Sequence, residues 1–154
     1  MSKPPNGRRI LLSTVSSDAH TWNLIYLQLL LTEHGNEVEN LGACVPTDLL
    51  ISTAVADGPD LIVISSINGH GFAEGLRLIE AIRATDDLRA TPVVIGGKLG
   101  IAGDLAEGSA ARLVSAGFDA VFEDGAKTVV SFYDFMSALP SATTPLERRP
   151  RVAA

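Results

Sequence analysis

Two kinds of hydrophobic pattern take turns along the chain. Short runs of leucine and β-branched residues, such as RILLSTV (9–15), have the length of strands, and each is followed by a longer segment with helical spacing. Within 72–86, for example, Leu76, Ile79 and Ile82 recur three residues apart. The pattern predicts five β–α units. The expected strands are 9–15, 36–42, 60–65, 91–97 and 119–125, and the expected helices are 21–35, 47–58, 72–86, 103–117 and 126–139.

The apolar content of each run predicts its place in the sheet. Runs 9–15, 60–65 and 91–97 are almost continuously apolar, which is typical of parallel strands covered by helices on both faces. Runs 36–42 and 119–125 mix polar and apolar residues, which is typical of edge strands. The contrast predicts an α/β fold with a flavodoxin-like, doubly wound, five-stranded parallel sheet in the order 2-1-3-4-5. Right-handed crossovers would then place helices on both faces.

Glycine, threonine and proline positions indicate where the second helix and the domain end. Gly58 follows the second expected helix and suits a C-terminal cap, while Thr47 suits its N-cap. One domain is expected over 9–139. A short flexible N-terminus, 1–8, precedes it, and 140–154 mixes proline, threonine and arginine, which predicts a disordered tail.

The composition restricts the class of protein. With 154 residues, of which 46% are hydrophobic and 19% charged, the chain is expected to form one well-packed domain. The formal net charge of −6 argues against nucleic acid or an anionic membrane as a partner. One cysteine excludes a disulfide within the chain, and no apolar run has the length of a membrane span. A reduced, cytoplasmic setting is therefore expected.

Three loops with small and polar residues are expected at one edge of the sheet. Ligands of an open parallel sheet bind beyond the carboxyl ends of the strands, here at the gap between the first and third strands. The loops that begin there read SSDAHTWN (16–23), SSINGHG (65–71) and GGKLGIAG (96–103). Their small residues would let a bulky ligand approach the backbone closely.

His20 is the residue with the most specific chemistry in these loops, and two interpretations of it are open. It is a solvent-facing loop histidine, with Ser17, Asp18 or Thr21 capping the next helix, or it is a metal ligand or acid–base group. In the second case Asp18 would bind the other ring nitrogen and set the tautomer. A single histidine does not support a zinc site with several protein ligands, but it suits a metal already held by a macrocycle.

Other sites of α/β proteins match these loops poorly. A phosphate-receiver domain needs an aspartate at the end of the third strand, where this chain has Ser65. The segment GHGFAEG misses the dinucleotide-binding pattern G-x-G-x-x-G by one residue, and GGKLG lacks the Ser or Thr that follows lysine in a phosphate-binding loop. No serine lies in a G-x-S-x-G turn.

The three loops together resemble the cobalamin-binding domain family, whose motifs are D-x-H-x-x-G, S-x-L and G-G. Asp18 and His20 match the first motif, 65–67 (SSI) matches the second with isoleucine for leucine, and 96–97 matches the third. The resemblance runs from about residue 9 to about residue 138. Within the family, the segments SDAH, VISSINGHG and GGKLGIAG look similar to the small subunit of glutamate mutase (methylaspartate mutase).

The resemblance implies a mode of cofactor binding. Cobalamin would bind with its dimethylbenzimidazole displaced from cobalt, His20 in the lower axial position and Asp18 bonded to the other ring nitrogen. The nucleotide tail would insert between the sheet and the first helix, near Ser65 and Gly97. The implied cofactor-binding residues, with His20 the metal ligand, are Ser17, Asp18, Ala19, His20, Thr21, Ser65, Ser66, Ile67, Gly96, Gly97, Lys98, Leu99, Gly100 and Ile101.

The resemblance also implies a function. The chain would be the cobalamin-carrying small subunit of an adenosylcobalamin-dependent carbon-skeleton mutase, an isomerase, and would not be catalytic alone. It would present adenosylcobalamin to a large barrel-type subunit. Two alternatives stay open: a non-enzymatic binding or regulatory module, and a corrinoid protein of methyl transfer. The short segment before the first strand counts against the second alternative, because such proteins usually carry a helical module there.

One residue departs from the family's pattern. Asn23 stands where the first motif has glycine, and the bulky Trp22 precedes it. The glycine leaves room for the nucleotide tail, so Asn23 is expected to narrow that space. Two interpretations stay open: Trp22 packs as a core or staple residue, or the departure weakens or abolishes cobalamin binding, which would support the regulatory alternative.

Overall fold

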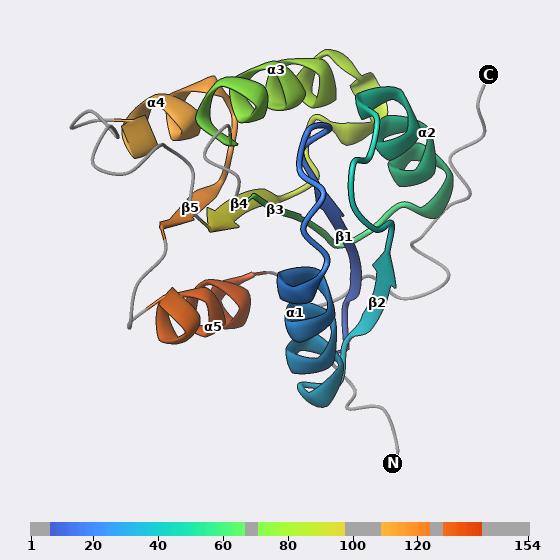
Figure 1. The fold of residues 1–154 in the computed structure, drawn as a ribbon, viewed down its shortest axis with the longest axis vertical. Helices are drawn as coiled ribbons and strands as arrows, with labels where there is room; N and C mark the ends of the chain where they lie inside the picture. Colours follow the sequence, from blue (N-terminus) through green and yellow to red (C-terminus); the bar gives the residue numbers. More distant parts are fainter. Residues whose placement is uncertain (1–6, 67–70, 98–108, 124–127, 140–154) are drawn as a thin grey trace.

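The computed structural model describes residues 7–66, 71–97, 109–123 and 128–139 and contains one parallel sheet. Its strands lie in the order β2-β1-β3-β4-β5, with β2 and β5 at the edges (Figure 1). The sheet confirms the predicted fold and strand order, because the continuously apolar runs are the three inner strands. The strands are β1 (Arg9–Thr14), β2 (Glu37–Asn40), β3 (Leu61–Ser65), β4 (Val93–Gly97) and β5 (Ala120–Glu123).

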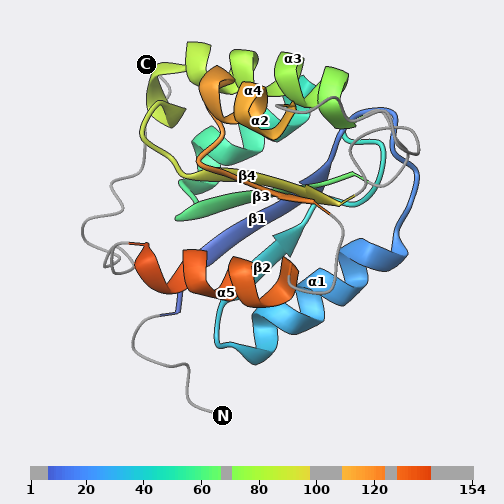
Figure 2. The same ribbon diagram turned by 90° about the vertical axis from the view of Figure 1, so that its left-hand side faces the viewer.

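Helices cover both faces of the sheet. α1 and α5 lie on one face, and α2, α3 and α4 lie on the other (Figure 2). A short 3₁₀ helix, η1, which the sequence pattern did not predict, buries Leu88 between α3 and β4. The first residues of the fourth expected helix, 103–108, lie outside the described residues. The helices are α1 (Trp22–Glu33), α2 (Thr47–Asp57), α3 (Gly71–Ala84), η1 (Asp86–Leu88), α4 (Ser109–Ala116) and α5 (Thr128–Ala138).

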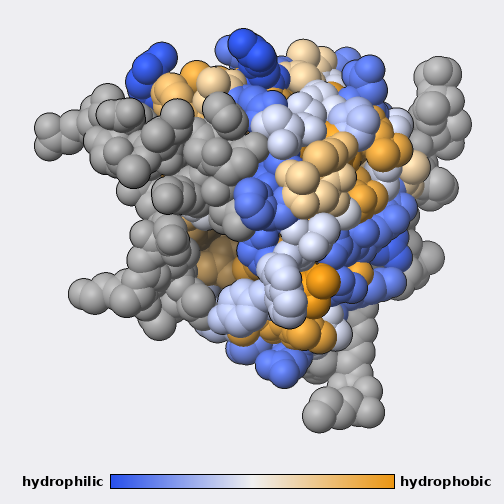
Figure 3. Space-filling view, viewed as in Figure 1, coloured by the Kyte–Doolittle hydropathy of each residue, from blue (hydrophilic) through white to orange (hydrophobic). Residues whose placement is uncertain are grey.

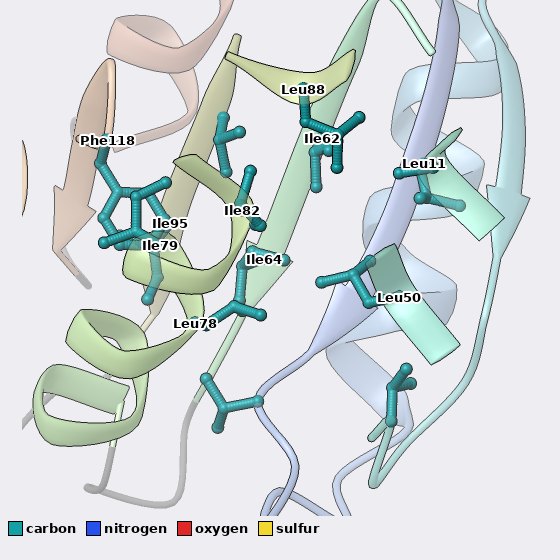
Figure 4. Close-up of a cluster of buried hydrophobic side chains, with 14 of the residues drawn as sticks. Leu11, Leu50, Ile62, Ile64, Leu78, Ile79, Ile82, Leu88, Ile95 and Phe118 are labelled. Carbon is teal, nitrogen blue, oxygen red and sulfur yellow. The ribbon is translucent and has the colours of Figure 1, made fainter. Parts of the chain in front are cut away.

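The core consists of two hydrophobic layers, one on each face of the sheet. Successive side chains of a strand point to opposite faces, so Ile62 and Ile64 join the layer under α2, α3 and α4 (Figure 4). Leu61 and Val63 of the same strand join the layer under α1 and α5. Burial of each such side chain contributes about 1.5–3 kcal/mol. Inner strands must therefore be apolar throughout, which explains why the sequence pattern identified them.

The two ends of α2 gave one confirmed prediction and one wrong one. Gly58 caps the C-terminus in the left-handed region, with φ of 59°, and its N–H donates to the carbonyl oxygen of Ala54. Thr47 is not the N-cap. Pro46 takes that position because its extended backbone (φ −61°, ψ 142°) suits a helix entry, and its carbonyl oxygen accepts the N–H of Leu50.

The outer side of α1 is unusually apolar. Trp22, Ile25, Tyr26 and Leu29 are 83%, 47%, 55% and 62% exposed, although α1 also buries Leu24 and Leu31 against the sheet. Orange side chains therefore reach the surface in the part of Figure 3 that α1 occupies in Figure 1. Apolar residues on more than one side of this helix are already visible in its sequence, TWNLIYLQLLLTEHG (21–35). None of the described helices is both long enough and apolar enough to cross a membrane.

Candidate functional site

Strand register brings the predicted motifs to one edge of the sheet. Thr14, the last residue of β1, pairs with Ser65, the last residue of β3, and Ser65 pairs in turn with Gly96 of β4. The loops that follow β1, β3 and β4 therefore start side by side. His20 lies in the first of these loops, just before α1. The topology thus assembles residues that are far apart in the sequence into one candidate site.

Asp18 and His20 form a hydrogen-bonded pair at this edge. The His20 Nδ1 lies 2.7 Å from Oδ1 of Asp18, and the same oxygen accepts the backbone N–H of His20 at 2.9 Å. The Asp18 side chain is completely buried, whereas 53% of the His20 side chain is exposed. The carboxylate therefore fixes the ring from the protein side and leaves the rest of the ring facing outward.

The geometry gives His20 the form of a metal ligand. A carboxylate accepts a hydrogen bond from Nδ1–H, so the lone pair of the neutral ring lies on Nε2. No described residue forms a hydrogen bond with Nε2. The described residues also contain no group of three or more His, Cys, Asp and Glu side chains that could hold a bare metal ion. The donor set fits a metal that needs one protein ligand.

The capping interpretation of this loop is confirmed for the position of Thr21 but not for a side-chain cap. Thr21 occupies the N-cap position of α1, but its side chain makes no capping hydrogen bond. The Asp18 carboxylate contacts the backbone N–H and the Nδ1 of His20 rather than the first turn of α1. The backbone of Asp18 is also held from outside the loop, since its carbonyl oxygen accepts the N–H of Cys44 at 2.8 Å.

A contact with α3 holds the beginning of the same loop. Both carboxylate oxygens of Glu74 accept hydrogen bonds, from the hydroxyl of Ser16 at 3.3 Å and from the hydroxyl of Ser17. The family resemblance places Ser17 in the cofactor site but gives no role to Glu74. No local pattern could have identified it, because Glu74 approaches the loop only through the packing of α3 on the sheet.

The remaining predicted site residues differ in exposure. Ala19 and Thr21 are exposed, while Ser65 and Ser66 are buried, and the N–H of Ser66 donates to the carbonyl oxygen of Gly96 at 3.0 Å. The candidate site therefore combines an exposed loop with two buried serines at the end of β3. The predicted residues that lie outside the described part of the chain are Ile67, Lys98, Leu99, Gly100 and Ile101.

Glycine occupies the last two positions of β4 for a different physical reason at each position. A Cβ at Gly96 would lie 3.0 Å from the carbonyl oxygen of Phe122, so glycine here lets β5 approach. Glycine at this position is thus explained by strand packing, and a contact of Gly96 with a ligand stays a prediction. Gly97 has a φ of 107°, a conformation that side chains with a Cβ rarely adopt, so glycine is needed to turn the chain into the next loop.

Asn23 fills space between α1 and the sheet. It lies in the first turn of α1, and its side-chain amide donates a hydrogen bond to the hydroxyl of Ser65 at the end of β3. Its amide oxygen, Oδ1, is buried and has no hydrogen-bond partner among the described residues. The residue that departs from the glycine of the first motif therefore contacts the first serine of the second motif.

Comparison with known proteins identifies the family of the chain. Residues 8–132 match the model of the B12-binding domain. The chain belongs to the B12-binding domain family. It is 29% identical to the glutamate mutase sigma subunit of Fusobacterium nucleatum over 118 residues, which are 77% of this chain and 86% of that protein. It is 33% identical to the glutamate mutase sigma subunit of Halobacterium salinarum over 113 residues, 73% of this chain and 74% of that protein.

One solved structure has the same fold as this chain. A cobalamin-binding protein from Desulfitobacterium hafniense superimposes with a TM-score of 0.70 and 18% sequence identity. The match covers 88% of this B12-binding domain but 60% of the solved chain, so the domain spans less than two thirds of that structure. At this level of identity the likeness concerns the fold alone.

Proposed function

We propose that this B12-binding domain binds cobalamin through His20 as the lower axial ligand of cobalt and presents it to a larger partner subunit. The observation that carries the proposal is the hydrogen-bonded pair of Asp18 and His20. In it, buried Asp18 orients a half-exposed imidazole beyond the carboxyl ends of the strands. A ring held in this way presents one nitrogen outward in a defined tautomer. A corrin supplies its own ring nitrogens as ligands, so one protein ligand would be sufficient.

The chain's own residues would hold the cofactor in two layers. The exposed loop of Ala19, His20 and Thr21 would face the corrin, and buried Ser65 and Ser66 would lie below it. Bound adenosylcobalamin supplies a cobalt–carbon bond that breaks homolytically and so provides radical chemistry. The domain's part is to bind, to orient the metal through His20 and to keep the imidazole in one tautomer.

The proposed partner is the large barrel-type subunit of a carbon-skeleton mutase similar to glutamate mutase. Two similar proteins carry the name glutamate mutase sigma subunit, which supports a role as one subunit of an isomerase. The exposed apolar side of α1 also supports a partner, because Trp22 and Ile25 lie next to the loop of His20. Apolar surface of this kind is typical of protein–protein interfaces. The substrate chemistry is assigned to the partner.

A second candidate function is a non-enzymatic B12-fold module with weak cobalamin binding. Asn23 is the specific observation that favours it, because its side chain occupies space beside Ser65. The two candidates predict different affinities for the same ligand, so one titration separates them.

The proposed function is tested by titrating the purified full chain with hydroxocobalamin and following the visible absorbance. We expect a saturable spectral change, because replacement of the axial ligands by an imidazole nitrogen changes the cobalt spectrum. A chain that stays folded and shows no spectral change at any ligand concentration would contradict the proposal and leave the non-enzymatic module. Binding without association with a barrel subunit would retain the cobalamin site and contradict the mutase role.

Asp18→Asn is expected to weaken cobalamin binding by about 10–100-fold, the usual effect of removing a carboxylate behind a metal-bound histidine. Asparagine has the same shape and can still accept the N–H of His20, so the fold should be retained. The measurement is the dissociation constant from the absorbance titration, with thermal melting as the check on folding.

A matched control for this substitution is Asp60→Asn. Asp60 also accepts a backbone N–H, that of Arg9 at 2.8 Å. It lies at the amino end of β3, away from the candidate site. The control should leave the affinity unchanged. Equal affinities of Asp18→Asn and the wild type would show that Asp18 only shapes the turn.

A further inference from the structure

The contact between Asn23 and Ser65 joins α1 to the centre of the sheet at the candidate site. Ser65 is 3% exposed and ends β3, and Asn23 belongs to the first turn of α1. The side-chain amide of Asn23 donates to the Ser65 hydroxyl across 42 residues of sequence. The beginning of α1 is therefore fastened to the strand that lies between β1 and β4.

The same contact is incomplete on its other side. Oδ1 of Asn23 is buried and accepts no hydrogen bond from the described residues, whereas buried polar atoms are almost always bonded. A desolvated acceptor without a donor destabilises the arrangement that buries it. The contact is thus held by one hydrogen bond and weakened by one unsatisfied atom, which makes it a contact that can open.

The chemistry of cobalamin directs its nucleotide tail toward this contact. The tail hangs from the lower face of the corrin, which is the face that a lower axial histidine occupies. If His20 binds cobalt, the displaced tail must lie on the protein side, beside His20. Asn23 follows His20 by three residues, and its side chain spans the space between the start of α1 and the end of β3.

We propose that the Asn23–Ser65 contact selects among corrinoids by their tail. This inference rests on the proposed function, because it assumes the His20-ligated form. A corrinoid without a nucleotide, such as cobinamide, can bind His20 while the contact stays closed. A complete cobalamin requires the contact to open before the tail can enter. Asn23 is therefore a specificity-determining residue that lowers the affinity for complete cobalamin and leaves the affinity for the tail-less corrinoid unchanged.

The experiment compares hydroxocobalamin and diaquocobinamide on four full-length proteins by absorbance titration. The proteins are the wild type, Asn23→Gly, Asn23→Ala and the control Gln28→Ala. Gln28 accepts a side-chain hydrogen bond from Asn40 at 3.2 Å, so the control also removes a bond between α1 and the sheet, but away from the site. Asn23→Ala separates loss of the amide from the low helix propensity of glycine.

We expect both Asn23 variants to bind hydroxocobalamin roughly tenfold more tightly, which corresponds to about 1.4 kcal/mol. Their affinity for diaquocobinamide should stay within about twofold, a difference well below 1 kcal/mol. Gln28→Ala should change neither affinity. In the absence of ligand, amide hydrogens in the first turn of α1 should exchange faster in Asn23→Ala than in the wild type.

The inference and the proposed function fail in different ways. Equal changes for both corrinoids, weaker cobalamin binding in the Asn23 variants, or unchanged exchange in α1 would overturn the selection by Asn23 while cobalamin binding stands. Absence of binding of both corrinoids to all four folded proteins would overturn the proposed function, and this inference with it.

Discussion

Replacing His20 with alanine or glycine is expected to abolish the histidine-ligated form of the bound cobalamin. The substitution removes the only protein atom proposed to bind cobalt, so its effect should exceed the roughly 10–100-fold loss that follows removal of a carboxylate behind such a histidine. The fold should be retained, because the His20 ring is half exposed and packs little apolar surface. The loss should therefore appear in binding and not in thermal stability.

Electron paramagnetic resonance of the cobalt(II) form measures this ligand directly. Nitrogen coupling in the wild type should change when the histidine nitrogens carry a different isotope, and this sensitivity should vanish in His20→Ala. Imidazole added to His20→Gly should restore an axial nitrogen, since the substitution leaves space where the ring was. A merely structural role of His20 would not produce rescue by imidazole.

His34→Ala is the matched control for this experiment. His34 lies at the other end of α1, where its Nδ1 is 3.0 Å from the carbonyl oxygen of Leu30 and its ring stacks on Tyr133. The control should keep both the affinity and the isotope-sensitive coupling. Coupling in the wild type that does not respond to histidine labelling would contradict the assignment of His20, because it would come from the benzimidazole of cobalamin itself.

Arg83→Met is expected to lower the free energy of unfolding by about 2–4 kcal/mol, the largest stability effect that we predict for a single substitution. The guanidinium of Arg83 donates to backbone carbonyl oxygens and to a carboxylate at 2.8–3.2 Å. These bonds join α3 to the segments that enter β4 and β5. Methionine keeps the apolar stem but removes the guanidinium donors, although the carbonyl oxygen of Leu88 and Oδ2 of Asp119 keep a second donor, the N–H of Thr91 and of Val93. The acceptors are the carbonyl oxygens of Leu88, Arg89, Thr91 and Gly117 and Oδ2 of Asp119.

Thermal melting of Arg83→Met beside Arg77→Met measures this effect. A chain of this length loses about 2–4 °C of melting temperature for each kcal/mol, so a drop of roughly 5–15 °C is expected. Arg77 is exposed on the same helix and makes no hydrogen bond or ion pair with the described residues, so its replacement should change little. Equal melting temperatures of the two variants would contradict the role of Arg83. Affinity for cobalamin should be unchanged, because the bonds lie at the amino ends of the strands.

Local residue patterns were sufficient to predict the architecture of this domain. Burial on both faces requires inner strands such as β3 to be apolar throughout, and the edge strands β2 and β5 to be mixed, so the strand order could be predicted. The position of the candidate site followed from the same order, since the loops after β1, β3 and β4 must start at one edge. The pairing of Asp18 with His20 could also be predicted from the sequence, because it joins neighbours within one turn.

The distant side chains that complete the site could be identified only from the packing of the folded chain. Ser17 meets Glu74 across 57 residues, and Asn23 meets Ser65 across 42 residues. Gly96, which the sequence motif associates with a ligand, also makes room for the carbonyl oxygen of Phe122 in β5. Such contacts depend on strand register and on the rotation of each helix about its axis. Register and rotation are set by the packing of the whole core, so no local pattern of residues predicts them.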